Sequence, residues 1–406
     1  MIAASKGWKV QSTDIRSAFL QGSELERDVY IKPPKEAELK GKVWKLKKCL
    51  YGLNDASRQF YLSIKEVLSL NGSKQSVGNP SFFYLKMEDK LEGVIVSHID
   101  DFLHTGSKNF DEQIVKPLKV KFSAGSEEEE NFSDVGFQVT QTPSGILLHQ
   151  LPYIAGLDAS TWSSDALNDK QRDLTTKEQT EFRALVGSLN WCVQGTRPDL
   201  AFEQIELATK IKNAKVEDYL KAIKLLKRLK STELTIMYPN MADLRKMEML
   251  VYSDASFANL DQMGSAGAYM VFCRNVDTGR SCPIGWKANK VKRVVRSTLA
   301  AEGLALAAGL DSAIYLRNFL SETLGIKPNI KGIVDNKGLV ENIHSTHLLE
   351  DRRLNLDLSA IKEMLERNEV ESIEWCPKDQ QLVDCMTKHG QRGDNLRKCL
   401  GSGKID

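Results

Sequence analysis

Two adjacent carboxylates interrupt an otherwise apolar stretch of this sequence. Asp100 and Asp101 follow the apolar run 94–96 and precede Phe102 and Leu103, so the pattern predicts two strands with the acids at or beside the turn between them. Asn-Gly or Asp-Gly would make a better two-residue turn, and two like charges about 4 Å apart repel by roughly 4 kcal/mol at an effective dielectric of about 20. A divalent cation would turn that repulsion into attraction. The pair is therefore a candidate metal site, although this stretch alone leaves a solvated acidic turn open.

A second set of acids lies in the last third of the chain. Asp254 and Asp335 each end a predicted strand, and Glu302 lies inside an Ala-rich predicted helix. Asp384 follows near the end of the chain. One such acid alone is usually a cap or an exposed side chain, but three or four converging carboxylates can hold two Mg²⁺ ions. Two metals about 4 Å apart can activate a water and stabilise the leaving oxygen of a phosphodiester. These acids therefore predict a second metal site, suited to phosphodiester hydrolysis.

The elements that must position these acids differ along the chain. Residues 8–14 are predicted as a strand, which places Asp14 at its carboxyl end, where α/β folds carry reactive groups; a helix N-cap is the alternative. The pattern is helical from 176 to 234, and beyond 249 strands and helices follow one another in an α/β order. Two polar segments are expected to be a linker and a solvated acidic loop, at 156–176 and 127–130 respectively.

Basic residues are clustered only locally. The net charge of the chain is +2, so composition gives no sign of polyanion binding as a whole. One cluster, on one face of a predicted helix, consists of Lys221, Lys224 and Arg228; another leads into the helix of Glu302 and consists of Lys287, Lys290, Lys292, Arg293 and Arg296. Both are predicted to contact phosphates without reading sequence, and ordinary solvated faces are the alternative.

Cysteine usage and hydropathy bear on the setting of the chain. There are seven cysteines and no Cys-x-x-Cys pair, which favours reduced thiols inside a cell and argues against a zinc ribbon. The first residues are too polar for a signal peptide. Because no run approaches about 18 uninterrupted apolar residues, we expect no membrane span.

An ordered series of short motifs gives the chain a family resemblance. The chain resembles the reverse transcriptase and ribonuclease H portion of a copia-type LTR-retrotransposon polyprotein over residues 7–390. The motifs that carry this resemblance lie, in order, at 14–22, 50–53, 98–101, 185–189 and 196–199, followed by the four later acids. One such motif would be weak, whereas the ordered series is specific.

The resemblance implies a mixed α+β/α/β fold with several domains. A reverse-transcriptase palm, an antiparallel sheet with helices that is shortened at its N-terminus, is expected over 1–155. A largely helical thumb or connection is expected over 156–245, and an RNase H-like α/β domain over 246–392. The remaining residues, 393–406, are polar and are expected to form a flexible tail.

The same resemblance implies roles for individual residues. Asp14, Asp100 and Asp101 would be the polymerase metal ligands. The ligands of the ribonuclease H site would be Asp254, Glu302, Asp335 and Asp384. Nucleotide or template binding is assigned to Phe19, as an aromatic beside the incoming sugar, to Gly52 and to Arg58. Each site would use two Mg²⁺ (or Mn²⁺) ions.

The resemblance also implies partners and a location. The partners would be RNA–DNA hybrid, template–primer and dNTPs, with no membrane, and the oligomeric state stays open. The location would be intracellular, in the cytoplasm within virus-like particles as in the family, with a nuclear location also open.

Departures from the family pattern leave two rival interpretations. His98 stands where the family usually has an aromatic residue, and only thirteen residues precede Asp14, where the family has most of its fingers. We therefore expect the chain to cut hybrids but to extend primers poorly. A decayed or domesticated fragment that binds nucleic acid without catalysis is one alternative, and a stand-alone α/β nuclease is a weaker one.

Overall fold

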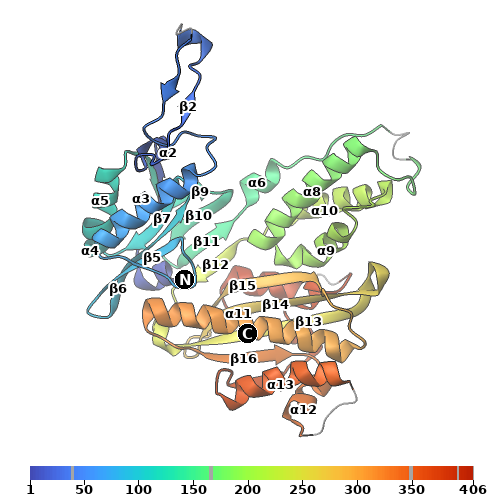
Figure 1. Cartoon of the computed structure of the whole chain (residues 1–406). Helices are drawn as coiled ribbons and strands as arrows, with labels where there is room; N and C mark the ends of the chain where they lie inside the picture. Colours follow the sequence, from blue (N-terminus) through green and yellow to red (C-terminus); the bar gives the residue numbers. More distant parts are fainter. Residues whose placement is uncertain (38–40, 164–167, 347–350, 391–392, 406) are drawn as a thin grey trace. The chain divides into compact units, whose positions relative to one another are not determined.

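The structure of the chain is a computed structural model that describes residues 1–406 except 38–40, 164–167, 347–350, 391–392 and 406 (Figure 1). The chain forms two units. An N-terminal unit comprises Lys6–Phe132 and Phe319–Gly325, and a C-terminal unit comprises Met1–Ser5, Ser133–Asn318 and Ile326–Asp406. The division into palm, connection and RNase H-like domain at the boundaries given above stays a prediction.

An antiparallel sheet of six strands forms the centre of the N-terminal unit, in the order β4-β5-β6-β7-β1-β8. On one face, Phe60, Ile64 and Leu68 of helix α3 follow helical spacing and are fully buried with Phe83 and Phe102 of the strands. The strands are β1 (Val10–Ile15), β4 (Lys74–Gln75), β5 (Phe82–Met87), β6 (Lys90–His98), β7 (Asp101–Gly106) and β8 (Ala124–Glu129). The helices that start within it are α2 (Ala18–Gln21), α3 (Ala56–Leu70), α4 (Lys108–Phe110) and α5 (Lys116–Lys121), with a π turn at Asp111–Val115.

Smaller elements complete the first third of the chain. They are α1 (Ile2–Lys6), a two-stranded sheet of β2 (Tyr30–Ile31) and β3 (Trp44–Lys45), and a 3-10 turn at Lys35–Ala37. The acidic run expected as a loop is instead strand β8, which pairs antiparallel with β1. It can be a strand because it is an exposed edge whose charges have cationic partners: Lys9 lies 3.0 Å from Glu129, and Lys119 lies 2.7 Å from Glu127.

A small sheet and a group of helices come next along the chain. The sheet has the order β12-β11-β10-β9, from β9 (Asn131–Asp134), β10 (Phe137–Thr142), β11 (Gly145–His149) and β12 (Ile236–Pro239). The expected helical stretch is confirmed as α8 (Thr176–Gly195), α9 (Ala201–Thr209) and α10 (Val216–Ser231), preceded by α6 (Leu151–Ala155). Thr175 and Glu178 form a capping box at the start of α8. Part of the predicted linker, 164–167, lies outside the described residues, but Trp162 stacks on Tyr219 of α10 with ring centroids 3.6 Å apart.

A mixed sheet of five strands follows, in the order β15-β14-β13-β16-β17. Strands β13 (Met247–Leu260), β14 (Gly264–Asn275) and β15 (Ser281–Lys290) are antiparallel, whereas β16 (Asn329–Val334) and β17 (Ser372–Trp375) run parallel to β13. Figure 1 shows α11 (Thr298–Leu324) along this sheet, with α12 (Lys337–His344) and α13 (Arg352–Glu366) beyond it. The strand and helix order confirms the expected RNase H-like α/β fold.

Helix α11 lies close against the sheet because its inner face is made of small residues. A Cβ at Gly309 would come within 2.7 Å of Val251 Cγ1, so only glycine allows this approach. By length and composition α11 could also cross a membrane, a test that the core helix of a soluble protein meets as well.

The expected flexible tail is instead helix α14 (Asp394–Ser402). Its residues Leu396, Cys399 and Leu400 are buried in the core of the C-terminal unit. The prediction failed because the segment is polar overall and hides three apolar residues at helical spacing.

Candidate metal centres

Three of the predicted ligands meet just beyond the last residue pair between β13 and β16. One carboxylate oxygen each from Asp254, Asp335 and Asp384 lies within 4.8 Å of the others. Asp254 is on β13, Asp335 directly follows the parallel neighbour β16, and Asp384 opens a 3-10 turn. Asp254 is 1% exposed and Asp384 7%, so their mutual repulsion is poorly screened. Such a set of hard oxygen ligands suits a divalent cation.

Glu302 faces the same point from α11. It is 8% exposed, and its Oε2 has no hydrogen-bond partner among the residues that the structure describes. Asn336, which follows Asp335, caps helix α12 through a bond from the Leu339 backbone N–H and also bonds to Glu302. A buried carboxylate oxygen without a donor is costly, so an ion at this position would supply the missing partner. The donors present therefore fit a divalent cation.

A lysine that the sequence did not single out completes this cluster. Lys388 Nζ lies 3.2 Å from Asp254 and also bonds to Asp384, which is four residues earlier in the chain. Thr387 donates a hydrogen bond to Asp254. Burial alone would lower the pKa of Lys388, but the two carboxylates outweigh burial and raise it. Lys388 therefore carries a fixed positive charge within the acidic cluster.

Sequence reasoning missed Lys388, Thr387 and Asn336, although Lys388 and Asn336 each left a signal. Lys388 is spaced i+4 from Asp384, and Asn336 is a typical N-cap residue directly after a strand. Neither signal, however, shows that the side chain of Lys388 or of Asn336 points toward the acids.

Burial shifts the protonation of two of these acids. It raises the pKa of Asp254 to about 6 and the pKa of Glu302 to about 7, and repulsion from neighbouring acids adds to both shifts. Lys388 and Thr387 oppose the shift at Asp254, and Asn336 opposes the shift at Glu302. Because both pKa values are raised in the folded state, the folded protein binds these two protons more tightly than the unfolded chain does. The stability of the metal-free fold therefore falls as the pH rises through 6 and 7.

Stabilisation by Mg²⁺ should consequently depend on pH. A metal binds the ionised acids, so the rise in Tm on adding Mg²⁺ should be small near about pH 5 and large near about pH 8. Thermal melts with and without Mg²⁺ across this range measure the difference. Asp335→Asn is the control and should lose the Mg²⁺-dependent rise at every pH. An equal rise at both ends of the range would contradict a carboxylate site with these pKa values.

The N-terminal unit places the other acid pair in a tight hairpin, as expected. His98 pairs with Asp101 at the junction of β6 and β7, so Ile99 and Asp100 form a two-residue loop. Ile99 has φ 59°, a left-handed conformation that is strained for a β-branched residue and costs about 1–3 kcal/mol. Strain of this kind is found where a turn must present particular side chains.

Asp14 lies next to this hairpin across the sheet. It pairs with Asp101 in the β1–β7 register, and the backbone N–H of Ile15 bonds to the Asp100 carbonyl at 2.9 Å. Opposite residues of an antiparallel pair share one face, so Asp14 and Asp101 point to the same side. Among the described residues, however, these three acids do not gather as closely as Asp254 and its partners. The Asp14 carboxylate is turned toward β8, where a Cβ at Gly125 would lie 2.3 Å from its Oδ2.

The predicted nucleotide-binding residues lie in the same unit as this hairpin. Phe19 is half-buried and packs on Tyr51 with ring centroids 4.6 Å apart, and on Phe60 at 6.4 Å. Gly52 is exposed with φ 96°, a backbone conformation that favours glycine. Arg58 is exposed on α3. Their assignment to nucleotide or template binding stays a prediction.

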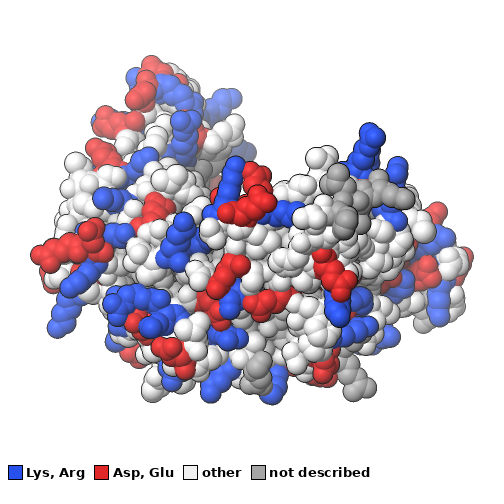
Figure 2. Space-filling model, turned by 90° about the horizontal axis from the view of Figure 1, so that it is seen from below, with Lys and Arg blue, Asp and Glu red and all other residues white. Residues whose placement is uncertain are grey.

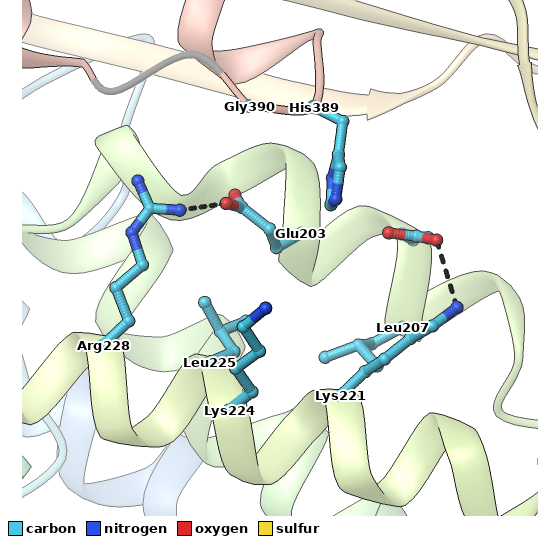
Figure 3. Close-up of a pocket in the computed structure, with 9 residues that line it drawn as sticks. Glu203, Leu207, Lys221, Lys224, Leu225, Arg228, His389 and Gly390 are labelled. Carbon is cyan, nitrogen blue, oxygen red and sulfur yellow. Dashed lines mark hydrogen bonds and ion pairs between the residues drawn. The ribbon is translucent and has the colours of Figure 1, made fainter. Parts of the chain in front are cut away.

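The basic face of α10 lines a pocket of about 450 Å³ opposite α9 (Figure 3). Arg228 pairs with Glu203, and Lys221 lies 3.5 Å from Glu206, so two of the three predicted cations are already neutralised within the chain. Lys224 is exposed, and His389, directly after Lys388, points into the pocket. The α10 cluster is thus less basic than its sequence indicates.

The second basic cluster is more exposed. Lys292 and Arg296 are exposed between β15 and α11, Arg293 pairs with Asp357, and Lys290 contacts the Asp261 carbonyl at 3.4 Å. Figure 2 shows Lys and Arg intermixed with Asp and Glu on the face it displays, in keeping with a net charge of +2. Any phosphate-binding surface must therefore be local.

Comparisons with known proteins show what this chain is similar to. Residues 1–160 match the family model described as reverse transcriptase (RNA-dependent DNA polymerase). The Retrovirus-related Pol polyprotein from transposon RE1 of Arabidopsis thaliana is 27% identical over 420 residues, which cover 95% of this chain and 27% of that protein. The Transposon TyH3 Gag-Pol polyprotein of Saccharomyces cerevisiae is 23% identical over 423 residues, 95% of this chain and 23% of that protein.

The chain is similar to copia-type retrotransposon Pol polyproteins over 95% of its length. It spans about a quarter of the length of the curated relatives it matches. The chain is also similar to solved structures. The native protease–reverse transcriptase of prototype foamy virus has 10% identity and a TM-score of 0.25 over 97% of this chain and 67% of that one. RNase H1 of Halobacterium salinarum has 15% identity and a TM-score of 0.25 over 33% and 89%. At such scores the fold assignment depends on the strand order described above.

These similarities confirm the resemblance drawn from the ordered motifs. Reverse transcriptases and ribonucleases H generally use divalent metals, and the triad of Asp254, Asp335 and Asp384 agrees with that. The chain is thus of a nucleic-acid-processing enzyme family.

Proposed function

We propose that the C-terminal unit hydrolyses the RNA strand of RNA–DNA hybrids. The observation that carries this proposal is the meeting of Asp254, Asp335 and Asp384 within 4.8 Å, with Glu302 beside them. Two bound Mg²⁺ (or Mn²⁺) ions would supply an activated water and stabilise the leaving 3′ oxygen of the cleaved phosphodiester. The four acids would hold these ions.

The residues around the acids have supporting roles in this proposal. Asn336 orients Glu302 through the hydrogen bond they share, and Thr387 fixes one oxygen of Asp254. Lys388 limits the negative charge of the cluster before substrate phosphate arrives. Glu302, with its pKa raised to about 7, can give or take a proton near neutral pH.

We further propose that the N-terminal unit is the palm of a reverse transcriptase that takes template–primer and dNTPs. Asp14, Asp100 and Asp101 would be its metal ligands. The strained hairpin at Ile99 and the shared face of Asp14 and Asp101 support this role. Full assembly requires the Asp14 carboxylate to turn from Gly125 toward the hairpin, a rotation of one side chain.

Incubation of the chain with a hybrid labelled on its RNA strand tests the hydrolytic proposal. With Mg²⁺, short RNA products should appear from the hybrid, and none should appear from the same RNA as a single strand or when EDTA is present. Intact RNA in the hybrid after prolonged incubation, from protein that binds it, would instead favour a non-catalytic nucleic-acid-binding fragment.

A further inference from the structure

An open groove of about 790 Å³ runs between helices α8 and α9 and the edge strand β15. Cationic, amide, aromatic and aliphatic side chains line it, and none of its described lining residues is Asp or Glu. The cations are Arg183, Lys287 and Lys290, and the aromatic residues are Tyr269 and Trp286. In a chain whose surface charges are otherwise mixed, this lining is complementary to an anionic polymer.

One side of α8 facing the groove is polar along its length. Arg183, Gly187, Asn190 and Gln194 are exposed, line the groove and repeat at spacings of three and four residues. Gly187 lies in the middle of the helix, where glycine is a poor choice. A Cβ there would meet nothing within 4 Å, so packing inside the chain does not require glycine. A glycine on an open groove suits the close approach of something outside the chain.

The groove lies close to the carboxylate cluster. In the sheet register Asp254 pairs with Ala268, and Ala268 pairs with Ala288, a groove residue of β15. Neighbouring strands are about 4.8 Å apart, so the backbone of the groove at Ala288 is about 10 Å from that of Asp254. A strand leaving the cluster could therefore enter the groove directly.

We propose that this groove holds a single nucleic-acid strand that extends from a hybrid bound at the carboxylate cluster. The proposal rests on the function proposed above for that cluster. Arg183, Lys287 and Lys290 contact phosphates, and Asn190 and Gln194 donate to phosphate or sugar oxygens. Tyr269 and Trp286 offer half-buried rings on which bases can stack, and the Trp286 ring is fixed by its bond to the Val193 carbonyl at 3.1 Å.

A nucleic-acid strand fits this lining better than a protein segment. An apolar segment would cover three cations without supplying counter-charges, which is unfavourable. An acidic segment could neutralise the cations, but its carboxylates would not stack on the two aromatic rings. A nucleic-acid strand carries both phosphates and stacking surfaces, and its binding is independent of sequence.

Fluorescence anisotropy with two hybrid probes tests the proposal. One probe is a blunt RNA–DNA hybrid, and the other carries a single-stranded extension of about ten nucleotides. The extension should raise the affinity of the unmodified chain about tenfold. Gly187→Trp, which fills the groove without removing charge, should abolish this gain. Lys287→Glu/Lys290→Glu should abolish it as well and make the salt dependence of binding shallower by about 1.4 units of slope, because two phosphate contacts are lost.

Matched variants outside the groove are the controls. Ala184→Trp adds the same side chain at an exposed position of α8, and Lys212→Glu/Lys227→Glu reverses two exposed lysines that do not line the groove. Both should keep the gain, and all variants should keep the Tm of the unmodified chain. A gain that survives in Gly187→Trp and in the groove lysine variant, or that is absent from the unmodified chain, would overturn the proposal.

Cutting of the blunt hybrid separates this proposal from the function on which it rests. A chain that cuts the blunt hybrid but gains no affinity from the extension would refute the groove alone. A chain that gains affinity but never cuts would refute the hydrolytic function alone. Failure to bind either probe would refute both.

Discussion

Asp335→Asn should lower the hydrolysis of RNA in a hybrid by roughly 10³-fold or more, the scale on which loss of one preorganised charge-stabilising group slows an enzyme. Asp335 is the best of the acids to replace because it is half-exposed at the end of β16, so the fold should tolerate the change. Asparagine keeps the shape of the side chain and one oxygen but removes a negative charge from the three that meet within 4.8 Å. The rate is measured from RNA products on a denaturing gel with Mg²⁺ present.

The hairpin of the N-terminal unit provides the matched control. Asp100 is also half-exposed and also follows a strand, but it belongs to the other candidate centre. Asp100→Asn should therefore cut hybrid at close to the unmodified rate. Cutting that persists in Asp335→Asn would place the hydrolytic site elsewhere. Loss of cutting in Asp100→Asn would show that the two centres are not independent.

The sequence predicted those parts of the two centres that depend on local patterns or on the ordered family motifs. The apolar runs before Asp100 and before Asp335 are local patterns. The structure confirms the hairpin at Asp100 and the end of a strand before Asp335. The convergence of Asp254, Asp335 and Asp384 was implied by the family resemblance, although Asp254 lies within β13 and does not end the strand as the pattern predicted.

What the sequence did not predict depends on contacts between distant segments or on side-chain direction. Glu127 and its neighbours form an edge strand because β1 needs a partner and nearby lysines offset the charge. Lys388 enters the acidic cluster because a 3-10 turn directs it there. The rotamer that turns Asp14 toward Gly125 leaves no trace in the sequence.

Arg197 forms a buried ion pair in the C-terminal unit. Its side chain is 0% exposed, and it pairs with Asp199, which is equally buried. The Arg197 guanidinium donates to both Asp199 oxygens at 2.9 Å, to the carbonyls of Leu229 and Thr232 near the end of α10, and to the Thr232 hydroxyl. Arg397 of α14 adds a contact to Asp199 at 3.1 Å. One buried ion pair thus connects α8, the end of α10 and α14.

Arg197→Met should lower the free energy of unfolding by about 3–5 kcal/mol, the usual cost of leaving one partner of a buried ion pair alone. Methionine replaces much of the volume, but two helix-end carbonyls lose the Arg197 donor and Asp199 keeps only its contact with Arg397. Urea unfolding of the whole chain, followed by tryptophan fluorescence, measures the loss as a lower midpoint.

Two further variants distinguish the loss of charge pairing from a simple loss of packing. Arg397→Ala removes the more exposed contact and should cost only about 1 kcal/mol, because Asp199 keeps its partner Arg197. Arg197→Met/Asp199→Leu removes both charges and should recover a large part of the loss, since a buried pair can often be replaced by apolar residues. If the double variant were as unstable as Arg197→Met, the loss of the buried partner of Asp199 would not be the cause. The expected pattern would mean that the motif at 196–199 holds three helices together, and that it does so through charge pairing rather than contact with nucleic acid.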